Sequence, residues 1–462
     1  MTRREEAGLH DQVQLQRGAT LPEAASAGQR AYALARELFP ICRSLTGPGV
    51  RETLRILQRE LPDLTTHEVP SGTQCFDWTV PPEWSIRGAY IEAEDGRRIV
   101  DFADSNLHVV GYSVPVDTVL TLDELRPHLH SLPELPDAIP YVTSYYRERW
   151  GFCLTHRQLQ ALMPGRYRVR IDSRLAPGSL TYGEILVPGA REEEIFLSTY
   201  ICHPSMANNE LSGPVVTAEL ARWLAALPQR RFSYRIVFIP ETIGSLVYLS
   251  RNLDEMKRRI VAGLNVTCVG DDRAYSYLPS RQADTLADRA ALHALRHQAG
   301  PKDFIRYSFL DRGSDERQYC SPGVDLPVAS IMRTKYGAYP EYHTSLDDLA
   351  LISPTGLAGG IAAIAKAILA IEVNGRYRTT VLGEPQLGRR GLYPTLSMRG
   401  GSPVVRRLTD VLAYSDGERD LLAIADLLGV PVWELSDVAQ QLLAHELLVD
   451  CDAEQIREDT KA

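Results

Sequence analysis

The second half of the chain alternates short apolar runs with longer segments in which apolar residues recur every three or four positions. The short runs have the length of buried strands, and the longer segments have helical periodicity. The predicted strands cover 195–201, 234–239, 260–269, 303–308 and 326–332. The predicted helices cover 212–227, 244–257, 286–298 and 353–373. This alternation is typical of a mainly parallel or mixed sheet with helices on both faces.

The N-terminal residues predict the edge of the same α/β unit. Apolar stripes predict helices over 22–39 and 49–61, with Gly47-Pro48-Gly49 as the break between them. Weak alternation over 64–69 predicts a strand. Residues 1–20 are polar without clear periodicity, and we expect them to form a loosely docked or disordered arm.

The composition changes between about residues 75 and 188. This stretch is rich in Tyr, Trp, Val and Thr, and it carries repeated turn signals and short alternating runs such as 167–172. It predicts a mostly β domain inserted into the α/β unit, with a long Pro-rich loop at 126–140.

The C-terminal part predicts a winged-helix module behind a linker at 376–400. Its helices are expected at 404–413, 421–428 and 432–443, with a short strand at 446–449. Asp and Glu residues outnumber arginines here, whereas a helix that reads a DNA groove needs positive charge to meet phosphates. The sequence therefore favours a packing or protein-interaction role over DNA binding.

A chain of 462 residues is too long for one ordinary core, so several domains are expected. We assign 1–74 and 189–375 to the two parts of the α/β domain. The insertion takes 75–188, and the linker with the winged-helix-like module takes 376–462.

Charge and targeting signals narrow the classes of partner. The net charge of -9 argues against general affinity for nucleic acid. The N-terminus has no apolar signal region and no run is long enough to span a bilayer, so we expect a cytoplasmic protein without a membrane partner. The seven cysteines are scattered singly, which indicates neither a disulfide framework nor a thiolate zinc site.

Four polar clusters follow predicted strands. They are His203 with Asn209 and Glu210, then Glu241, then Asp271 with Asp272, and finally His343. Ligands bind outside the carboxyl ends of strands in an open α/β sheet, and two histidines with carboxylates are ligands that zinc prefers. Taken singly, each cluster has a simpler explanation as a loop, cap or turn residue, and no compact motif such as HExxH is present. The convergence of the clusters on one edge favours a metal site.

Several longer motifs identify a family. They are Asp77-Trp-Thr-Val-Pro-Pro-Glu-Trp84, Tyr141-Val-Thr-Ser-Tyr-Tyr146, Trp150-Gly-Phe-Cys153, Cys202-His-Pro-Ser-Met-Ala-Asn-Asn-Glu210, Pro240-Glu-Thr-Ile-Gly-Ser245, Arg312-Gly-Ser-Asp-Glu-Arg-Gln-Tyr-Cys320 and Tyr342-His-Thr-Ser345. From about residue 25 to 450 the chain resembles the aminopeptidase-like proteins of bacterial polysaccharide and natural-product gene clusters. The resemblance implies a zinc-aminopeptidase-like three-layer α/β core with a mixed sheet, an inserted small β domain and a C-terminal winged helix. The looser parent is the zinc aminopeptidase clan, which holds two adjacent metal ions.

This chain departs from the parent pattern at several ligand positions. His203 matches the first metal histidine of the parent, and His343 matches the last. Asn209 stands where the parent has an aspartate that bridges the two metals, and an uncharged amide is a poor zinc bridge. Glu210 is expected to supply the carboxylate instead.

The second half of the parent pattern is also altered. Glu241 matches the general base, but Thr242 replaces the metal-binding glutamate that follows it. The third-ligand aspartate of the parent aligns near Thr267, which leaves Asp271 or Asp272 as approximate substitutes.

The resemblance with these departures implies one zinc held by His203, Glu210 and His343, with water in the fourth position. A second ion is left open. Zinc lowers the pKa of its water and polarises the scissile carbonyl, while Glu241 takes the proton and delivers it to the leaving amine.

A charged run and a neighbouring tyrosine are the candidate substrate contacts. They are Arg312, Asp315, Glu316, Arg317 and Tyr342. A carboxylate here suits a free amino group, and Arg317 or Arg333 suits a substrate carboxylate. An internal ion pair between Asp315 and Arg317 explains these two residues equally well.

The leading hypothesis is a zinc-dependent amide or peptide hydrolase that acts on a small-molecule or short peptide-like substrate in a biosynthetic or modification pathway. The alternative is a catalytically altered binding or scaffold protein, because Asn209 and Thr242 replace ligands. A serine or cysteine hydrolase using Ser314 or Cys202 is weakly supported, since neither lies in a GxSxG-like elbow. No nucleic-acid partner is expected, and homo-oligomerisation stays open.

Overall fold

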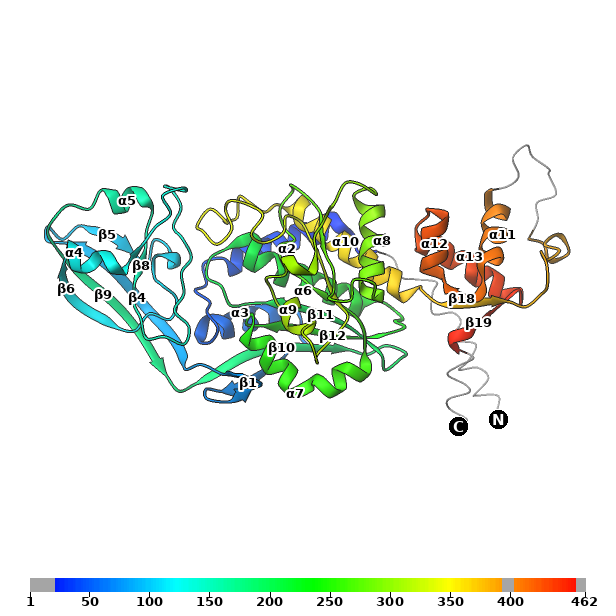
Figure 1. Cartoon of the computed structure of the whole chain (residues 1–462), viewed down its shortest axis with the longest axis horizontal. Coiled ribbons are helices and arrows are strands. Elements are labelled where there is room, and N and C mark those ends of the chain that lie inside the picture. Colours follow the sequence, from blue (N-terminus) through cyan, green and yellow to red (C-terminus); the bar gives the residue numbers. More distant parts are fainter. Residues whose placement is uncertain (1–20, 393–402, 454–462) are drawn as a thin grey trace.

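The computed structural model describes residues 21–392 and 403–453 and arranges them as three units in a row (Figure 1). The inserted β domain lies at one end, the α/β unit in the middle and the C-terminal module at the other end. The arm expected at 1–20 and the linker residues 393–402 lie outside the described residues.

The central sheet of the α/β unit has eight strands. Their order is β1 (Thr65–Pro70), β10 (Ser179–Val187), β12 (Ser233–Ile239), β11 (Glu194–Tyr200), β13 (Ile260–Asn265), β16 (Val328–Met332), β14 (Ser276–Leu278) and β15 (Ile305–Arg306). The strands β12, β11, β13 and β16 are parallel, and the sheet is mixed because β1, β10 and β14 pair antiparallel. Leu197 of β11 lies between Ile236 of β12 and Leu264 of β13.

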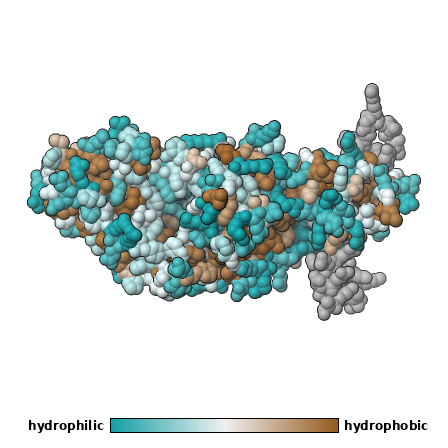
Figure 2. All heavy atoms as spheres, in the orientation of Figure 1, coloured by the Kyte–Doolittle hydropathy of each residue, from teal (hydrophilic) through white to brown (hydrophobic). Residues whose placement is uncertain are grey.

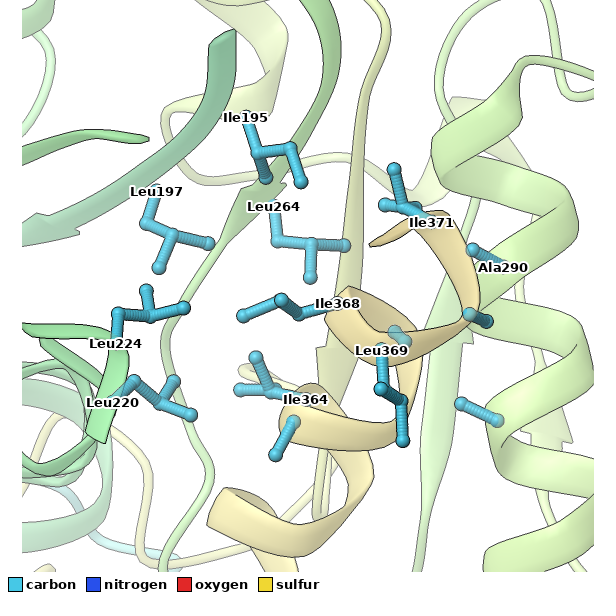
Figure 3. Close-up of a cluster of buried hydrophobic side chains, with 14 of the residues drawn as sticks. Ile195, Leu197, Leu220, Leu224, Leu264, Ala290, Ile364, Ile368, Leu369 and Ile371 are labelled. Carbon is cyan, nitrogen blue, oxygen red and sulfur yellow. The ribbon is translucent and has the colours of Figure 1, made fainter. Parts of the chain in front are cut away.

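Helices cover both faces of this sheet, as the alternation of elements predicted. One face packs against α2 (Ala24–Leu38), α3 (Pro48–Glu60), α6 (Ser212–Ala226), α8 (Leu286–Gln298) and α10 (Pro354–Glu372). The other face packs against α7 (Ile243–Arg259) and α9 (Glu316–Tyr319). Along β11, Ile195 and Leu197 face α6 and α10 (Figure 3). Phe196 faces the opposite way, toward α7. This alternation of side chains builds the three layers.

The helix α10 lies in the middle of the larger core. Ile364 and Ile368 point from it toward the sheet, and Leu369 lies on the side toward α8 (Figure 3). The expectation that no run is long enough to span a bilayer is wrong for α10, which within the described ranges has the length and apolar composition to do so, but 67% of its apolar window is buried inside the protein. On the face shown in Figure 2, hydrophobic residues lie in separate patches among polar ones.

The inserted domain is built on an antiparallel sheet. Its strands lie in the order β5 (Arg98–Asp101), β4 (Glu83–Ala93), β9 (Arg166–Ala176) and β6 (Val116–Thr121). Shorter elements complete it: α4 (Leu122–Leu125), β7 (Leu129–His130), β8 (Phe152–Cys153) and α5 (His156–Gln160). After β9 the chain continues directly into β10, which belongs to the central sheet, so the α/β unit resumes at Ser179 rather than at 189.

The C-terminal module has the helices and wing of a winged helix. Its elements are β17 (Arg376–Thr379), α11 (Pro403–Tyr414), β18 (Asp416–Asp420), α12 (Leu421–Leu428), α13 (Val432–Ala444) and β19 (Leu448–Asp450). The start of the predicted linker is wrong, because β17 is the central strand of the sheet β18-β17-β19. Tyr377 is buried there between exposed Arg376 and Arg378, a three-residue alternation too short to be recognised in the sequence.

Acidic side chains attach this module to the α/β unit. Asp420 pairs with Arg289 at 2.5 Å, and Asp426 pairs with Arg296 at 2.7 Å. At the start of α13, the backbone N–H of Val432 donates to Nε2 of His293, 2.9 Å away. The acidic character of the module is therefore used in part to bind the basic side chains of α8.

Candidate metal centre

His203, Glu241 and His343 meet at the carboxyl ends of the central parallel strands. His203 lies three residues after β11, Glu241 two residues after β12, and His343 in the connection from β16 to α10. The centroids of the two imidazole rings are 5.5 Å apart, and His203 Nε2 is 3.7 Å from Glu241 Oε2. Imidazoles that share one zinc have centroids roughly 5 Å apart, given Zn–N bonds of about 2.0–2.1 Å. The spacing of these rings fits a shared ion.

Glu210 faces the other side of His203. Its Oε2 is 2.8 Å from His203 Nδ1, and its Oε1 accepts a hydrogen bond from Arg43 Nε at 3.1 Å. Arg43 also donates to the backbone carbonyl of His203, and both Arg43 and Glu210 are fully buried. Glu210 was expected to bind the ion, but both of its oxygens are engaged. Through its contact with Nδ1, Glu210 orients the ring of His203 and leaves Nε2 free to bind a metal ion.

The two histidines differ in charge. Burial lowers the pKa of His343 to about 3, and the nearby His203 adds to this effect. Burial also opposes protonation of His203, but the Glu210 carboxylate at its Nδ1 helps to raise the pKa of His203 well above its ordinary value. His343 is thus a neutral ring with a free lone pair, while the surroundings of His203 favour positive charge at that ring, from a proton or from a metal ion.

Buried polar atoms without a hydrogen-bond partner gather around these residues. They include His343 Nε2, Asn209 Oδ1, Ser314 Oγ, Asp315 Oδ2 and Arg317 Nε. An unpaired buried polar atom costs about 1–3 kcal/mol, so a cluster of them in one place calls for an explanation. A bound ion and a polar substrate would supply the missing partners.

Three residues at or beside the centre have an unusual backbone conformation. Thr242, Cys268 and His343 have φ angles of 62°, 50° and 56°, in the left-handed region that β-branched and bulky residues avoid. Such conformations cost about 1–3 kcal/mol each and are typically kept at functional sites.

Two of the departures from the two-metal pattern, Asn209 and Thr267, lie in a neutral hydrogen-bonded cluster. Asn209 Nδ2 donates to the hydroxyl of Tyr200 at 2.7 Å, and that hydroxyl shares a hydrogen bond of 2.6 Å with Thr267 Oγ1. All three residues are buried, and none of them carries a charge. A second divalent ion would find no carboxylate in this cluster, which favours a single-ion arrangement.

Asp271 does not belong to this centre. Its Oδ2 accepts from Asn208 Nδ2 and from the N–H of Thr334, and its Oδ1 accepts from Thr334 Oγ1 and from the N–H of Arg273. The prediction that Asp271 substitutes for the missing metal-binding aspartate is wrong, because these four hydrogen bonds from Asn208, Arg273 and Thr334 already engage both oxygens of its carboxylate. Neighbouring Asp272 binds the hydroxyl of Ser353 at the start of α10.

The charged run contributes two residues to the centre. Asp315 Oδ1 accepts from the N–H of Thr242 at 2.7 Å, and Arg317 Nη2 donates to the Thr242 hydroxyl at 2.6 Å. Burial, followed by the charge of Glu241, raises the pKa of Asp315 to about 7. Burial likewise raises the pKa of Glu241, whereas His203 and Arg317 act in the opposite direction.

The other two members of the charged run, Glu316 and Arg312, are not candidate substrate contacts in the structure. Glu316 is fully buried, and its carboxylate accepts from the N–H groups of Gly313 and Ser314, the hydroxyl of Tyr336 and the amide of Asn265. It is therefore a structural residue rather than a substrate contact. Arg312 is exposed and lies over the ring of Phe309.

Tyrosines form the walls of the centre. Tyr342 stacks on His343 with ring centroids 3.9 Å apart. Tyr141, from the inserted domain, contacts His203 and His343 edge to face at 5.3 and 5.2 Å, and its N–H donates to the carbonyl of His343. The inserted domain thus completes the site and helps to hold His343.

Two positioning residues escaped the sequence analysis. Arg43 lies between α2 and α3, more than 150 positions before His203 and Glu210, and no local pattern marks it as a partner of these residues. Asp347 accepts the N–H groups of Asn208 at 2.6 Å and Asn209 at 3.0 Å. These bonds stabilise a wide helical turn at Ala207–Leu211, where a loop was expected. The sequence signal for Asp347 is its position only four residues after the candidate ligand His343.

A different group of metal-capable atoms lies on the Nδ1 side of His203. Cys202, His203 and Glu210 each offer an atom there within 4.8 Å of the others. Arg43 already neutralises the carboxylate of Glu210, and burial raises the pKa of Cys202 to about 11, so its thiol stays protonated. The guanidinium would repel a cation at this place. The Nε2 side is the better position for an ion, and a protonated thiol also disfavours a cysteine hydrolase.

Comparison with known proteins places this geometry in a family. Residues 32–374 match the family model described as a domain of unknown function, DUF4910, and residues 375–450 match a winged helix-turn-helix model. A protein of Clostridium acetobutylicum, named for polysaccharide biosynthesis and an aminopeptidase-like domain, is 45% identical over 423 residues, which are 91% of this chain and 96% of the relative.

Solved structures agree in fold. A crystal structure of a protein from Clostridium acetobutylicum described as a peptidase is 42% identical, with a TM-score of 0.87 over 96% of this chain and 99% of the other. The zinc aminopeptidase BSAP of Bacillus subtilis has a TM-score of 0.53 at 13% identity, over 74% of this chain and 94% of its own. An M28 peptidase precursor of Shewanella amazonensis also reaches 0.53 at 13% identity, over 78% and 97% of the two chains.

The last two similarities show the fold alone. The expected architecture, a zinc-aminopeptidase-like α/β core with a C-terminal winged helix, is confirmed. The chain belongs to the DUF4910 family of aminopeptidase-like proteins.

Proposed function

We propose that this protein is a zinc-dependent hydrolase of an amide or peptide bond in a small molecule. The observation that supports this most strongly is the pair of imidazoles of His203 and His343. These residues are distant in the sequence, but their rings lie 5.5 Å apart with Glu241 beside them. His203 and His343 would hold one ion through their Nε2 atoms. Asn209 Oδ1, buried and unpaired, replaces Glu210 as the third protein donor that we propose.

The chemistry follows from the position of Glu241. A bound zinc supplies a water of lowered pKa and polarises the substrate carbonyl. Glu241 lies next to Nε2 of His203, where the ion would bind. From there Glu241 would take the proton from the attacking water and return it to the leaving amine. Burial raises the pKa of Glu241, while His203 and Arg317 act in the opposite direction, and a raised pKa makes this carboxylate a better proton acceptor than an exposed glutamate.

Two groups are placed to orient the substrate. Asp315 Oδ2 and Arg317 Nε are buried beside Glu241 without partners, and both residues are fixed through Thr242. Asp315 suits a free amino group, and Arg317 suits a carboxylate or the carbonyl oxygen of the substrate. Arg317 also brings a positive charge close to the residue that replaces the second metal-binding glutamate of the two-metal parent.

The name of one relative bears on the biological setting. The Clostridium acetobutylicum relative is named for polysaccharide biosynthesis, which supports a role in a biosynthetic or modification pathway. A cytoplasmic location agrees with such a role and stays a prediction.

The scaffold alternative rests on Asn209 and Thr242, and a metal count separates it from the hydrolase. Protein purified without added metal is expected to carry about one zinc per chain by elemental analysis, and His203→Ala or His343→Ala should each lose it. His156→Ala, in a helix of the inserted domain, is the matched control and should retain the metal. Metal-free wild-type protein with an unchanged fold would favour the scaffold.

We also propose that the C-terminal module packs against the α/β unit and does not bind DNA. In a winged helix the N-terminal end of the recognition helix contacts the bases. Here the start of α13 is covered, because Val432 binds His293 and Trp433 meets the same ring edge to face at 5.7 Å.

Removing one acidic contact tests this packing. Asp426→Asn weakens the pairs with Arg296 and His293 and is expected to destabilise the docked module by about 1 kcal/mol, since the site is partly exposed. Hydrogen exchange of α13 should accelerate about fivefold, whereas Glu434→Gln, which affects a pair within the module, should leave it unchanged. Salt-dependent binding of the full chain to a DNA duplex would contradict the proposal.

A further inference from the structure

Three exposed aromatic side chains lie where the inserted domain meets the α/β unit. Phe76 and Trp78 come from the hairpin of β2 (Gln74–Cys75) and β3 (Trp78–Thr79), and Tyr146 comes from the loop that begins at Tyr141. They are 49%, 40% and 51% exposed. The rings of Trp78 and Tyr146 meet edge to face at 69°, with centroids 5.8 Å apart. We call Phe76, Trp78 and Tyr146 the aromatic corner.

The backbone holds this corner in place at an energetic cost. Phe76 and Tyr146 have φ angles of 55° and 61°, which are unusual for bulky residues. Phe76 occupies the first position of a two-residue hairpin turn, where glycine is preferred when φ is positive. The hydroxyl of Tyr146 donates to the carbonyl of Thr79, which joins the loop to the hairpin. Strain that keeps large rings in water is the kind of outlier that points to a function.

A short stretch of chain links the corner to the metal centre. Tyr141 contacts both metal-site histidines, its hydroxyl shares a hydrogen bond of 2.6 Å with that of Tyr145, and Tyr146 is the next residue. Five residues of fully extended chain span at most about 18 Å, so the Cα atoms of Tyr141 and Tyr146 are no farther apart than that. A substrate of a few linked rings can reach from the centre to the corner.

We infer that the aromatic corner is a subsite for a hexopyranose ring of the substrate. The inference rests on the proposed function and deepens it: the hydrolysed amide would belong to an acylated or aminoacylated amino sugar. A pyranose has an apolar C–H face that packs on an aromatic ring and a rim of hydroxyls that stays in water, which suits half-exposed rings set at an angle. An acyl chain would bind more favourably in an enclosed apolar pocket, which buries more of its surface, than on half-exposed rings. The net charge of -9 disfavours nucleic acid.

Binding measured without turnover tests the subsite. In Glu241→Gln protein, saturation-transfer NMR with N,N′-diacetylchitobiose and cellobiose should show contact through ring C–H protons, and titration gives the affinity. Trp78→Ala and Phe76→Gly should each weaken sugar binding about tenfold, the loss of one stacking contact. Phe76→Gly removes the ring but suits a left-handed turn, so the fold is retained. Tyr414 is a partly exposed aromatic residue on α11, and Tyr414→Ala is the control, which should leave the affinity for both disaccharides unchanged.

The outcomes separate the subsite from the proposed function. Sugar affinity that is unchanged in Trp78→Ala and Phe76→Gly, or no binding of either disaccharide at millimolar concentration, overturns the subsite even if zinc and amide hydrolysis are found. Binding of octanoate or tryptophanamide at the corner in preference to sugars overturns the ligand class. Corner-dependent sugar binding by a protein without zinc supports the subsite while the hydrolase assignment fails.

Discussion

Replacing Glu241 with glutamine is expected to lower the turnover of aminoacyl amides by about 10²–10⁴-fold while zinc remains bound. A positioned general base contributes an effect of this size, and glutamine keeps the shape of the side chain but cannot take a proton. The ion is retained because the two histidine nitrogens are unchanged. Steady-state kinetics with an aminoacyl amide panel, together with elemental analysis of the same sample, measure both quantities.

A matched substitution separates chemistry from folding. Glu219 lies on α6, where its buried carboxylate pairs with the half-exposed Arg30 and with Arg222 rather than with a residue of the metal centre, so Glu219→Gln should keep full activity. If Glu241→Gln retains wild-type kcat with zinc bound, the assigned base is wrong. Loss of zinc in this variant would instead assign Glu241 to the ligand set.

Replacing Arg43 with methionine is expected to destabilise the protein by about 3–5 kcal/mol. Arg43 and Glu210 are both fully buried, and removing one partner leaves an uncompensated charge in the interior. The backbone carbonyls of Leu38 and His203 lose a donor at the same time. Urea denaturation followed by circular dichroism measures the change in the free energy of unfolding.

Two variants check the cause of this loss. Arg30→Met removes a half-exposed arginine whose buried partner Glu219 still pairs with Arg222, so the substitution should cost no more than about 1 kcal/mol. The double variant Arg43→Met with Glu210→Met should recover much of the stability, since no lone charge remains. Its activity should nevertheless stay low, because His203 loses the carboxylate that orients its ring. Equal destabilisation in Arg43→Met and Arg30→Met would contradict the account.

The sequence predicts the layers of this protein because the relevant patterns are local. The buried run that becomes β11 and the helical spacing that becomes α6 and α10 each lie within one segment of chain. Parallel strands then bring His203, Glu241 and His343 to one edge, which is a geometric consequence of the predicted order.

The roles within the site could not be predicted in the same way. Sequence spacing does not tell which nitrogen of His203 faces the cleft, so Glu210 was taken for a ligand although it binds Nδ1. That distinction depends on Arg43, which is distant in sequence and carries no metal-site pattern. Asp271 was close enough in the chain to serve as a substitute, but hydrogen bonds to Asn208 and Thr334 use its carboxylate.

The position of a bound ion tests the central claim most directly. Crystals of protein purified without added metal, with diffraction recorded on both sides of the zinc absorption edge, would locate it. We expect a single anomalous peak about 2.0–2.1 Å from Nε2 of both His203 and His343. The absence of a peak there, or a peak on the Nδ1 side of His203 beside Cys202 and Glu210, would contradict the account.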